Sequence, residues 1–479
     1  MNAAAELPRP ARLAARNPLT GLEDYSFDVA SRADVQAACA AVRQAQPEWA
    51  ALGVAGRIAV LQRLSTSFEQ HQAELIAAIA ADTGRRRIAA IEFAGVQGMI
   101  AANCALAPVV FSDAAERASM IPGIVGRRQL VAYPVVGVIA PWNFPLILSM
   151  IDAIPALVAG CAVVLKPSEV TPRYVDPLRK IFAAVPELDR VFRVVRGPGA
   201  TGADVIDGVD AIVCTGSVRT GRIVAEHAAR RFIPAFLELG GKDPAIVTAD
   251  ADLDRASTAV VRASVLATGQ ACQSLERVYV DQRVYADFVR RVVAKVQPIT
   301  LTCHESNGHI GPFIMGRQAD IVKDHIDDAI ARGAKLEIGG HLVEQGGRWC
   351  EPTVLSGVTH AMRVMKEETF GPVIPIMPYR TLDEAITLAN DGEYGLSANV
   401  FAGSESDAQA IAERLEAGLV SIGDASMSSF VMDFEWEGFR LSGLGRARIG
   451  VSGIARYLRV KAIVTNRGPA AGVMDARDE

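Results

Sequence analysis

One cysteine stands where it could act as a nucleophile. Cys272 lies in the segment GQACQSLERVYV, residues 269–280, behind a Gly-Gln-Ala turn and ahead of a run that reads as a strand. The thiolate is the reactive form, and a free cysteine with a pKa of about 8.5 is only a few per cent thiolate at pH 7. The alternative reading is a small buried hydrophobe, so the decision depends on what else the chain supplies.

Glu238 and Asn143 are the residues that could serve such a thiol. Glu238 lies between apolar residues in FLELGGKDP, where burial would raise its pKa toward the range of a general base. A glutamate at the exposed end of a strand is the alternative. Asn143 lies in PWNFP, where its amide is either a helix N-cap or a donor aimed at a developing oxyanion.

Two further segments contain groups that could hold a dinucleotide. LKPSE places Lys166 and Glu169 just after a strand, either in a solvated loop or as partners for the hydroxyls of an adenosine ribose, where a carboxylate favours NAD. TGSVRTG, residues 215–221, follows a strand and begins a helix, so its backbone N–H groups could approach a pyrophosphate. GPGATG, residues 197–202, matches G-x-G-x-x-G, but the expected acid about 20 residues later is absent, so a β-turn is the better reading.

The elements that must position these groups change in character along the chain. The first hundred residues have helical spacing, with one pattern beginning behind Ser31 and another ending at Gly84. From about residue 130, short apolar runs alternate with helix-length segments, which is typical of βαβ units around a parallel sheet. Several runs end in a residue named above, and ligands bind beyond the carboxyl ends of such strands.

Composition limits the remaining possibilities. The chain of 479 residues has a net charge of −5 and no long basic tract, so we expect no nucleic-acid partner. Its seven cysteines are scattered without a C-x-x-C pair, which predicts no metal site and a reducing compartment. The N-terminus lacks an apolar signal region, and Asp152 and Pro155 interrupt the apolar stretch 146–165. We therefore expect a buried helix and strand there, no membrane partner and a cytoplasmic protein.

Taken together, PWNFP, LKPSE, TGSVRTG, FLELGGKDP, GQACQSLERVYV and EETFGPV resemble the aldehyde dehydrogenase superfamily, in the family's order. The resemblance runs from about residue 17 to 467. Glu238 and Cys272 are 34 residues apart, and Asn143 and Lys166 are 23 apart, as in typical members. The type resembled is the non-acylating, NAD(P)-dependent one.

This resemblance implies an α/β fold with a Rossmann-type cofactor domain, an α/β catalytic domain and a bridging oligomerisation hairpin. The corresponding ranges are 1–111 and 133–240 for the NAD-binding domain, 241–440 for the catalytic domain, and 112–132 and 441–479 for the oligomerisation elements. The hairpin, ASMIPGIVGRRQLVAY, would pair with a partner subunit's catalytic domain through the tail strand. A homodimer or homotetramer is therefore expected.

The resemblance also implies a role for each site residue. Cys272 is the nucleophile, Glu238 the general base, and Asn143 forms the oxyanion hole with the backbone N–H of Cys272. Glu368 and Phe370 hold the nicotinamide end of NAD; NADP is possible but less favoured. The other implied cofactor residues are Trp142, Lys166, Ser168, Glu169, Gly216 and Ser217.

Three departures from the family pattern affect the substrate more than the chemistry. Ala267 replaces a frequent Asn, Cys214 replaces a Phe, and EWEGFRLSG has Trp436, Glu437 and Arg440 where the family has Phe, Gly and Lys. The helix after PWNFP and the loop 425–436 would line the substrate tunnel with apolar groups, which favours an apolar or aromatic aldehyde. The predicted substrate residues are Phe144, Leu148, Ile151, Phe430 and Trp436.

The implied reaction is oxidation of an aldehyde to its acid through a thiohemiacetal and a thioester on Cys272. A semialdehyde dehydrogenase, with Arg440 turned inward as a carboxylate clamp, is one alternative. A CoA-acylating dehydrogenase is a second, although Glu238 favours hydrolysis. A NAD-binding structural protein without turnover is a third, and the presence of Cys272, Glu238 and Asn143 counts against it.

Overall fold

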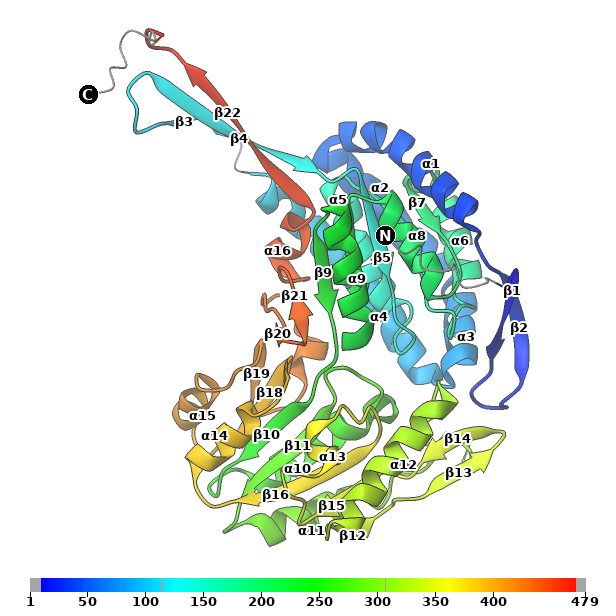
Figure 1. Ribbon diagram of the computed structural model, residues 1–479, viewed down its shortest axis with the longest axis vertical. Helices are drawn as coiled ribbons and strands as arrows, with labels where there is room; N and C mark the ends of the chain where they lie inside the picture. Colours follow the sequence, from blue (N-terminus) through cyan, green and yellow to red (C-terminus); the bar gives the residue numbers. More distant parts are fainter. Residues whose placement is uncertain (1–9, 113–114, 306, 471–479) are drawn as a thin grey trace.

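The computed structural model describes residues 10–112, 115–305 and 307–470 as two α/β lobes and a long β-ribbon that projects from the first lobe (Figure 1). The ends of the predicted segments 1–111 and 441–479 lie outside the described residues. The predicted α/β fold class is confirmed.

The first lobe is built on a six-stranded sheet with the order β21-β9-β8-β5-β6-β7. All its strand pairs are parallel except that between β21 and β9. Without β21, the chain order across the sheet is that of a doubly wound dinucleotide fold, whose ligand crevice opens between the first and fourth strands, here β5 and β8. The strands are β5 (Val135–Ile139), β6 (Ala162–Lys166), β7 (Phe192–Val194), β8 (Ala211–Thr215), β9 (Ala235–Glu238) and β21 (Gly443–Leu444).

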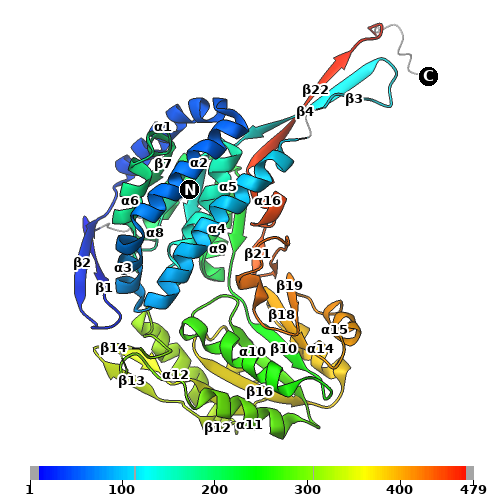
Figure 2. The ribbon, with the colours of Figure 1, turned by 180° about the vertical axis from the view of Figure 1, so that it is seen from behind.

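Helices cover this sheet, and Figure 2 shows α2 and α4 side by side over it. The first helix begins at Ser31, whose side chain forms a capping box with Asp34, and the third ends at Gly84 with φ 68°, as predicted. The helices are α1 (Arg32–Ala51), α2 (Gly53–Gln70), α3 (Gln72–Thr83), α4 (Arg86–Val110), α5 (Ile147–Ala159), α6 (Val175–Ala183), α7 (Pro186–Val191), α8 (Gly199–Gly208), α9 (Val218–Arg231) and α16 (Gly450–Ala455). An outlying hairpin pairs β1 (Arg12–Arg16) with β2 (Glu23–Asp28).

Two apolar segments of this lobe bear on the membrane question. Residues 146–165 form α5 and β6, and nearly all their side chains are buried, which confirms the predicted helix and strand. One described helix, α4, is long and apolar enough to cross a membrane, and 39% of its apolar 18-residue stretch is buried. It packs against α2, α3, α5 and α16, and helices in a protein core can be equally long and apolar.

The second lobe has a seven-stranded sheet with the order β12-β15-β16-β11-β10-β18-β19, parallel except for β12. Its strands are β10 (Asp243–Val247), β11 (Leu275–Asp281), β12 (Lys335–Ile338), β15 (Thr353–Ser356), β16 (Val373–Tyr379), β18 (Ser397–Phe401) and β19 (Leu419–Ile422). Its helices are α10 (Leu253–Val265), α11 (Tyr285–Val296), α12 (Gly316–Ala331), α13 (Arg363–Lys366), α14 (Leu382–Asn390), α15 (Glu405–Ala412) and the 3₁₀ turns η1 (Leu266–Gly269) and η2 (Met427–Ser429). Two small antiparallel pairs join β13 (Leu342–Gln345) to β14 (Gly347–Cys350) and β17 (Tyr394–Gly395) to β20 (Phe439–Arg440).

The projecting ribbon contains β3 (Arg117–Ala118), β4 (Ile124–Ala132) and β22 (Leu458–Asn466), in the order β22-β4-β3. The tail strand β22 pairs with the hairpin of its own chain, from Leu458 opposite Ala132 to Asn466 opposite Ile124. Part of the predicted oligomerisation segment 441–479 lies elsewhere: β21 pairs with β9, and α16 packs on α4 and α5. Residues 443–455 therefore belong structurally to the first lobe, because a two-residue edge strand and a short helix complete its sheet and core.

Candidate active site

The predicted base lies where the chain passes from the first lobe to the second. Glu238 is the last residue of β9, and Lys242 directly precedes β10. The Glu238 side chain is 7% exposed, and burial raises the pKa of its carboxyl group. Its backbone carbonyl accepts a hydrogen bond from the N–H of Gly216 at 3.1 Å, which ties it to the end of β8.

The predicted nucleophile follows an unusual turn. Ala267, Thr268 and Gly269 have φ values of 54°, 63° and 67°, so three successive residues are left-handed between α10 and Cys272. This conformation is strained for a β-branched residue, and the Thr268 hydroxyl is held by a hydrogen bond to the Gly311 carbonyl at 3.0 Å. The turn places Cys272 against the base loop so closely that a Cβ at Gly241 would clash with the carbonyl oxygen of Cys272.

The surroundings of the Cys272 thiol favour its protonated form. Its side chain is half-buried, and desolvation is the largest cause that raises its pKa to about 12, with the carboxylates of Glu368 and Asp243 adding to it. The Arg448 guanidinium acts in the opposite direction. A thiol in this setting would need a base to remove its proton before it could act as a nucleophile.

Asn143 is joined directly to the nucleophile turn. Its side chain, 5% exposed, donates from Nδ2 to the carbonyl oxygen of Gln270 at 3.1 Å. Gln270 is fixed in turn, because its Oε1 accepts a hydrogen bond from the N–H of Ile314 at 3.0 Å. The structure thus brings the Asn143, Cys272 and Glu238 segments together, as the sequence predicted.

Two buried charges that the sequence analysis missed hold this segment in place. Arg85 donates from Nη1 to the carbonyl of Ala267 at 3.0 Å and from Nη2 to the carbonyl of Asn143. Glu92, 1% exposed, accepts the backbone N–H groups of Leu146 and Ile147 at 3.0 and 3.1 Å. A glutamate within the apolar run of α4 was the available signal, because a buried carboxylate needs partners.

The predicted adenosine residues lie at the carboxyl end of β6. The Lys166 ammonium, in a side chain 6% exposed, lies 2.9 Å from the Glu169 carboxylate, whose side chain is 39% exposed. Ser168 is buried between them, and its hydroxyl accepts the N–H of Val170 at 3.2 Å. An ammonium and a carboxylate side by side provide a donor and an acceptor for two vicinal hydroxyls.

The predicted pyrophosphate residues lie at the end of β8, across the crevice from PWNFP. Ser217 caps α9 by accepting the N–H of Thr220 at 3.3 Å. A Cβ at Gly216 would meet no atom closer than 3.8 Å. The backbone there is open to a bound group at the start of a 14-residue helix.

The predicted nicotinamide residues come from the second lobe. The Phe370 ring packs edge-on against Trp142, with centroids 5.5 Å apart and planes at 72°. Glu368 accepts the N–H of Gly241 at 3.0 Å, and burial, aided by the nearby Glu276, raises its pKa to about 8. The first and second lobes therefore contribute facing aromatic groups to one site.

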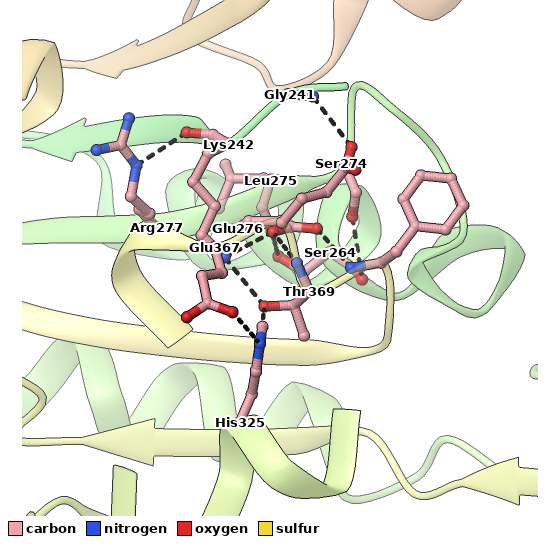
Figure 3. A network of polar contacts seen from close by, with 12 residues as sticks. Gly241, Lys242, Ser264, Ser274, Leu275, Glu276, Arg277, His325, Glu367 and Thr369 are labelled. Carbon is pink, nitrogen blue, oxygen red and sulfur yellow. Dashed lines mark hydrogen bonds and ion pairs between the residues drawn. The ribbon is translucent and has the colours of Figure 1, made fainter. Parts of the chain in front are cut away.

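A buried ion pair, also missed from the sequence, supports this segment (Figure 3). Lys242 Nζ lies 2.6 Å from Glu276 Oε2, with both side chains at most 3% exposed. The Glu276 carboxylate also accepts the N–H groups of Thr369 and Phe370, each at 2.8 Å. These bonds hold Phe370 in its left-handed conformation, φ 53°. Figure 3 shows His325 below Thr369, whose hydroxyl lies 3.2 Å from its Nδ1.

The predicted substrate residues are only partly gathered. Ile151 is buried in the core of the first lobe, and Leu148 and Trp436 pack against that core. The Arg85 guanidinium lies 5.2 Å from the centre of the Phe144 ring. Phe430 is 57% exposed, with Arg262 over its ring at 6.0 Å.

Arg440 does not turn inward. It donates from Nη1 to the carbonyls of Asn390 and Gly392, at 2.6 and 2.5 Å, and pairs with Glu416. Among the residues that the structure describes, no group of three His, Cys, Asp or Glu side chains forms a metal-ligand cluster.

The comparisons with known proteins agree with this geometry. The family model described as "Aldehyde dehydrogenase family" matches residues 8–463. A protein of Mycolicibacterium smegmatis, provisionally named succinate-semialdehyde dehydrogenase [NADP(+)], is 39% identical over 94% of this chain and 87% of its own. The 4,4'-diapolycopene aldehyde oxidase of Methylomonas sp is 36% identical over 95% and 86%.

Solved structures of aldehyde dehydrogenases also match nearly the whole chain. A protein of Anabaena variabilis, provisionally named aldehyde dehydrogenase PutA, has a TM-score of 0.93 and 46% identity, over 96% of this chain and 99% of its own. Lactaldehyde dehydrogenase of Escherichia coli has a TM-score of 0.91 and 32% identity, over 95% and 96%. The chain belongs to the aldehyde dehydrogenase family and is an oxidoreductase that oxidises an aldehyde to its carboxylic acid.

Proposed function

We propose that the aldehyde is oxidised through a covalent intermediate on Cys272, with Asn143 as an oxyanion donor and Glu238 as the base. The observation that carries the proposal is the meeting of two loops. Gly241, three residues after Glu238, lies so close to the carbonyl of Cys272 that an added Cβ would clash with it, and the Asn143 side chain donates a hydrogen bond to the carbonyl of Gln270, two residues before Cys272. A nucleophile, a base and an amide donor are thereby held at one junction.

The first step forms the bond between Sγ of Cys272 and the aldehyde carbon. The thiol proton passes to Glu238 and the carbonyl π electrons move to the oxygen. One N–H of the Asn143 side chain is bonded to Gln270, which leaves the second N–H for this oxyanion, together with the backbone N–H of Cys272. NAD, when bound, accepts the hydride whose loss converts the thiohemiacetal into a thioester.

The second step hydrolyses the thioester. Glu238 first releases the thiol proton to solvent, and its carboxylate then takes a proton from water as the water oxygen attacks the thioester carbon. The C–Sγ bond breaks as Glu238 gives that proton to the departing sulfur. The carboxylic acid leaves and Cys272 is restored. Because burial raises the pKa of Glu238, its carboxylate is a stronger base than an exposed glutamate.

The donor set fits a dinucleotide, which we propose is NAD in preference to NADP. Lys166 and Glu169 would hold the adenosine ribose, with Ser168 beside them, Gly216 and Ser217 the pyrophosphate, and Trp142, Glu368 and Phe370 the nicotinamide end. Glu169 would repel a 2′-phosphate, although Lys166 lies only 2.9 Å from it. The Mycolicibacterium relative is named for NADP(+), so cofactor preference is measured first, as kcat/KM for each cofactor.

For the substrate we propose an apolar or aromatic aldehyde of moderate size. Leu148 and Ile151 of α5 belong to the same apolar cluster as Trp436, and Phe144 lies three residues before the first residue of α5. Arg440 is fully engaged elsewhere, so it offers no clamp for a distal carboxylate. The semialdehyde alternative is supported by the name of the Mycolicibacterium relative.

One panel separates the candidates: kcat/KM for benzaldehyde-type, medium aliphatic and succinic semialdehyde substrates, each with and without CoA. We expect the apolar aldehydes to be preferred, and no CoA dependence. Preference for succinic semialdehyde would refute the apolar-site proposal, and a CoA requirement would refute hydrolysis. Cys272→Ala should abolish turnover while retaining NAD binding, and comparable turnover in that variant would refute the nucleophile assignment.

We also propose a cytoplasmic homodimer or homotetramer. All seven cysteines are free, which suits a reducing compartment. On the ribbon that projects from the first lobe, strand β22 leaves Val460 and Val464 62% and 63% exposed (Figure 1). Light scattering of the full chain checks the assembly: a monomer would refute it. Cell fractionation checks the location.

A further inference from the structure

A fully buried cluster of three charges lies beside the proposed base. Asp152, in α5, is 1% exposed and accepts hydrogen bonds from two arginines. Arg448 Nη2 donates to Oδ2 at 2.6 Å, and Arg456 Nη2 donates to Oδ1. The arginine side chains are 8% and 0% exposed. Two guanidinium groups therefore share one carboxylate, which leaves one positive charge unbalanced.

Sheet register places this surplus charge next to Glu238. Arg448 Nη2 also donates to the Thr215 hydroxyl at 3.0 Å. Thr215 is the register partner of Glu238 on the neighbouring parallel strand, and such partners carry their side chains on the same face. On the other side, Gly443 of β21 is the partner of Glu238, and the chain reaches Arg448 five residues later.

An ionised Glu238 completes the charge balance. Arg448 and Arg456 contribute two positive charges, and Asp152 and Glu238 two negative ones. A protonated Glu238 would leave the surplus positive charge buried, which is costly. Arg448 Nε and Arg456 Nε are also buried without a hydrogen-bond partner among the described residues.

We propose that Arg448 is a positioning residue that keeps the Glu238 carboxylate ionised and oriented for thioester hydrolysis, with Asp152 limiting how strongly it does so. The inference rests on the proposed function, because it assumes that Glu238 is the hydrolytic base.

The charged groups around Glu238 act in the directions that the proposal requires. Burial is the largest influence and raises its pKa; Arg448 and then Arg456 lower it, while Asp152 and Glu437 raise it. Cys272, the other titratable group facing this site, is itself influenced by Arg448, which lowers its pKa, and by Glu238, which raises it. Arg448 thus favours the anionic form of both reacting groups.

The test measures hydrolysis of the acyl-enzyme alone. An activated ester, 4-nitrophenyl acetate, acylates a thiol without a hydride step, so the steady rate after its burst reports hydrolysis. The pH dependence of this steady rate is recorded for wild type, Arg448→Gln, Arg448→Lys and Asp152→Asn, with Cys272→Ala as the blank. Thermal melting of each variant and its NAD affinity check the fold.

The rate of hydrolysis falls at low pH as Glu238 is protonated, and this fall is the acidic limb of the profile. Arg448→Gln should raise the apparent pKa of the acidic limb by about one pH unit, so that at pH values below it the hydrolysis rate is about tenfold lower than in wild type. Arg448→Lys should restore most of the shift. Asp152→Asn should move the limb the opposite way, whereas a purely structural role would weaken both variants without opposite shifts. If Arg448→Gln does not fold, Asp152→Asn alone tests the proposal. An apparent pKa of its acidic limb that is unchanged or higher than in wild type would overturn the proposal.

Glu238→Gln separates this inference from the proposed function. If that variant keeps a wild-type hydrolysis profile, the assignment of Glu238 as base is wrong. If it loses hydrolysis but Arg448→Gln leaves the limb unmoved, Glu238 stands and only the role of Arg448 is refuted.

Discussion

The buried pair of Lys242 and Glu276 should be one of the most sensitive points of the second lobe, and Glu276→Ala tests it. The substitution removes a carboxylate that accepts from Lys242 Nζ at 2.6 Å and from the N–H groups of Thr369 and Phe370 at 2.8 Å. It leaves an ammonium in a side chain 2% exposed without its counter-ion.

The expected cost is large. Breaking a buried pair on one side costs about 3–5 kcal/mol, and a buried N–H without an acceptor about 1–3 kcal/mol. These contributions overlap, because Lys242 keeps a bond to the Thr369 hydroxyl at 3.0 Å and water can enter a truncated site. We expect a loss of about 5 kcal/mol, a large part of the stability of a typical domain.

Equilibrium unfolding in urea measures this loss, and a double variant supplies the matched control. Lys242→Met with Glu276→Gln removes both charges and keeps a side-chain oxygen for a backbone N–H. It should unfold at a higher urea concentration than Glu276→Ala. In folded protein, Glu276→Gln should raise the KM for NAD more than it lowers kcat, because Phe370 loses its support. A cost below about 1 kcal/mol for Glu276→Ala would show that the pair does not hold this segment.

Three further outcomes are expected at the site. Asn143→Ala should lower kcat about a hundred- to a thousandfold, the usual cost of one oxyanion donor; a loss below about fivefold would remove it from that role. Glu169→Gln should narrow the ratio of kcat/KM for NAD over NADP, and an unchanged ratio would show that the carboxylate does not face the ribose. Iodoacetamide should label Cys272 in the free enzyme about tenfold faster for each pH unit from pH 7 to 10, because the thiolate fraction rises steadily below a pKa of about 12. Mass spectrometry of the Cys272 peptide measures the labelling rate, and a rate that levels off below pH 9 would contradict this expectation.

The sequence predicts the position in the fold of a candidate site residue where that residue stands at or just after the end of a buried strand. Glu238 ends β9, Lys166 ends β6, and Asn143 follows β5 by a few residues. Parallel strands bring their carboxyl ends to one edge, so the positions of these residues in the alternating pattern suffice to gather them.

The supporting charges could not be predicted in this way. Arg85 reaches Asn143 from 58 residues away, and Asp152 reaches Arg448 from 296. Such pairs leave no periodic pattern, since each partner looks like an isolated charge in an apolar element. The edge strand β21 was missed for a related reason, because two residues cannot show alternation.

The direction of side chains in the loops and short elements could not be predicted from the sequence either. Arg440, with φ 52°, ends the two-residue strand β20, and Phe430 directly follows the 3₁₀ turn η2. Elements this short have no helical or strand period that would fix the face on which a side chain lies. Their orientation is decided by distant partners: Glu416 and two carbonyls for Arg440, and Arg262 for Phe430. Substrate specificity, which depends on such loops, is therefore the least predictable property of the chain.

In two segments that meet at the site, a proposed reacting residue is followed four positions later by a member of the buried ion pair. Lys242 lies four residues after Glu238, and Glu276 lies four residues after Cys272. The first member of each pair is a proposed reacting group, and the second joins the buried ion pair of 2.6 Å. This ion pair joins the segment that follows Glu238 to the segment that follows Cys272. Gly241 allows the two segments to approach closely, since any side chain there would clash with the Cys272 carbonyl. The separation of the proposed base and the proposed nucleophile thus depends on residues to which the proposed reaction gives no chemical role, and this gives the costly burial of the Lys242–Glu276 pair a structural reason.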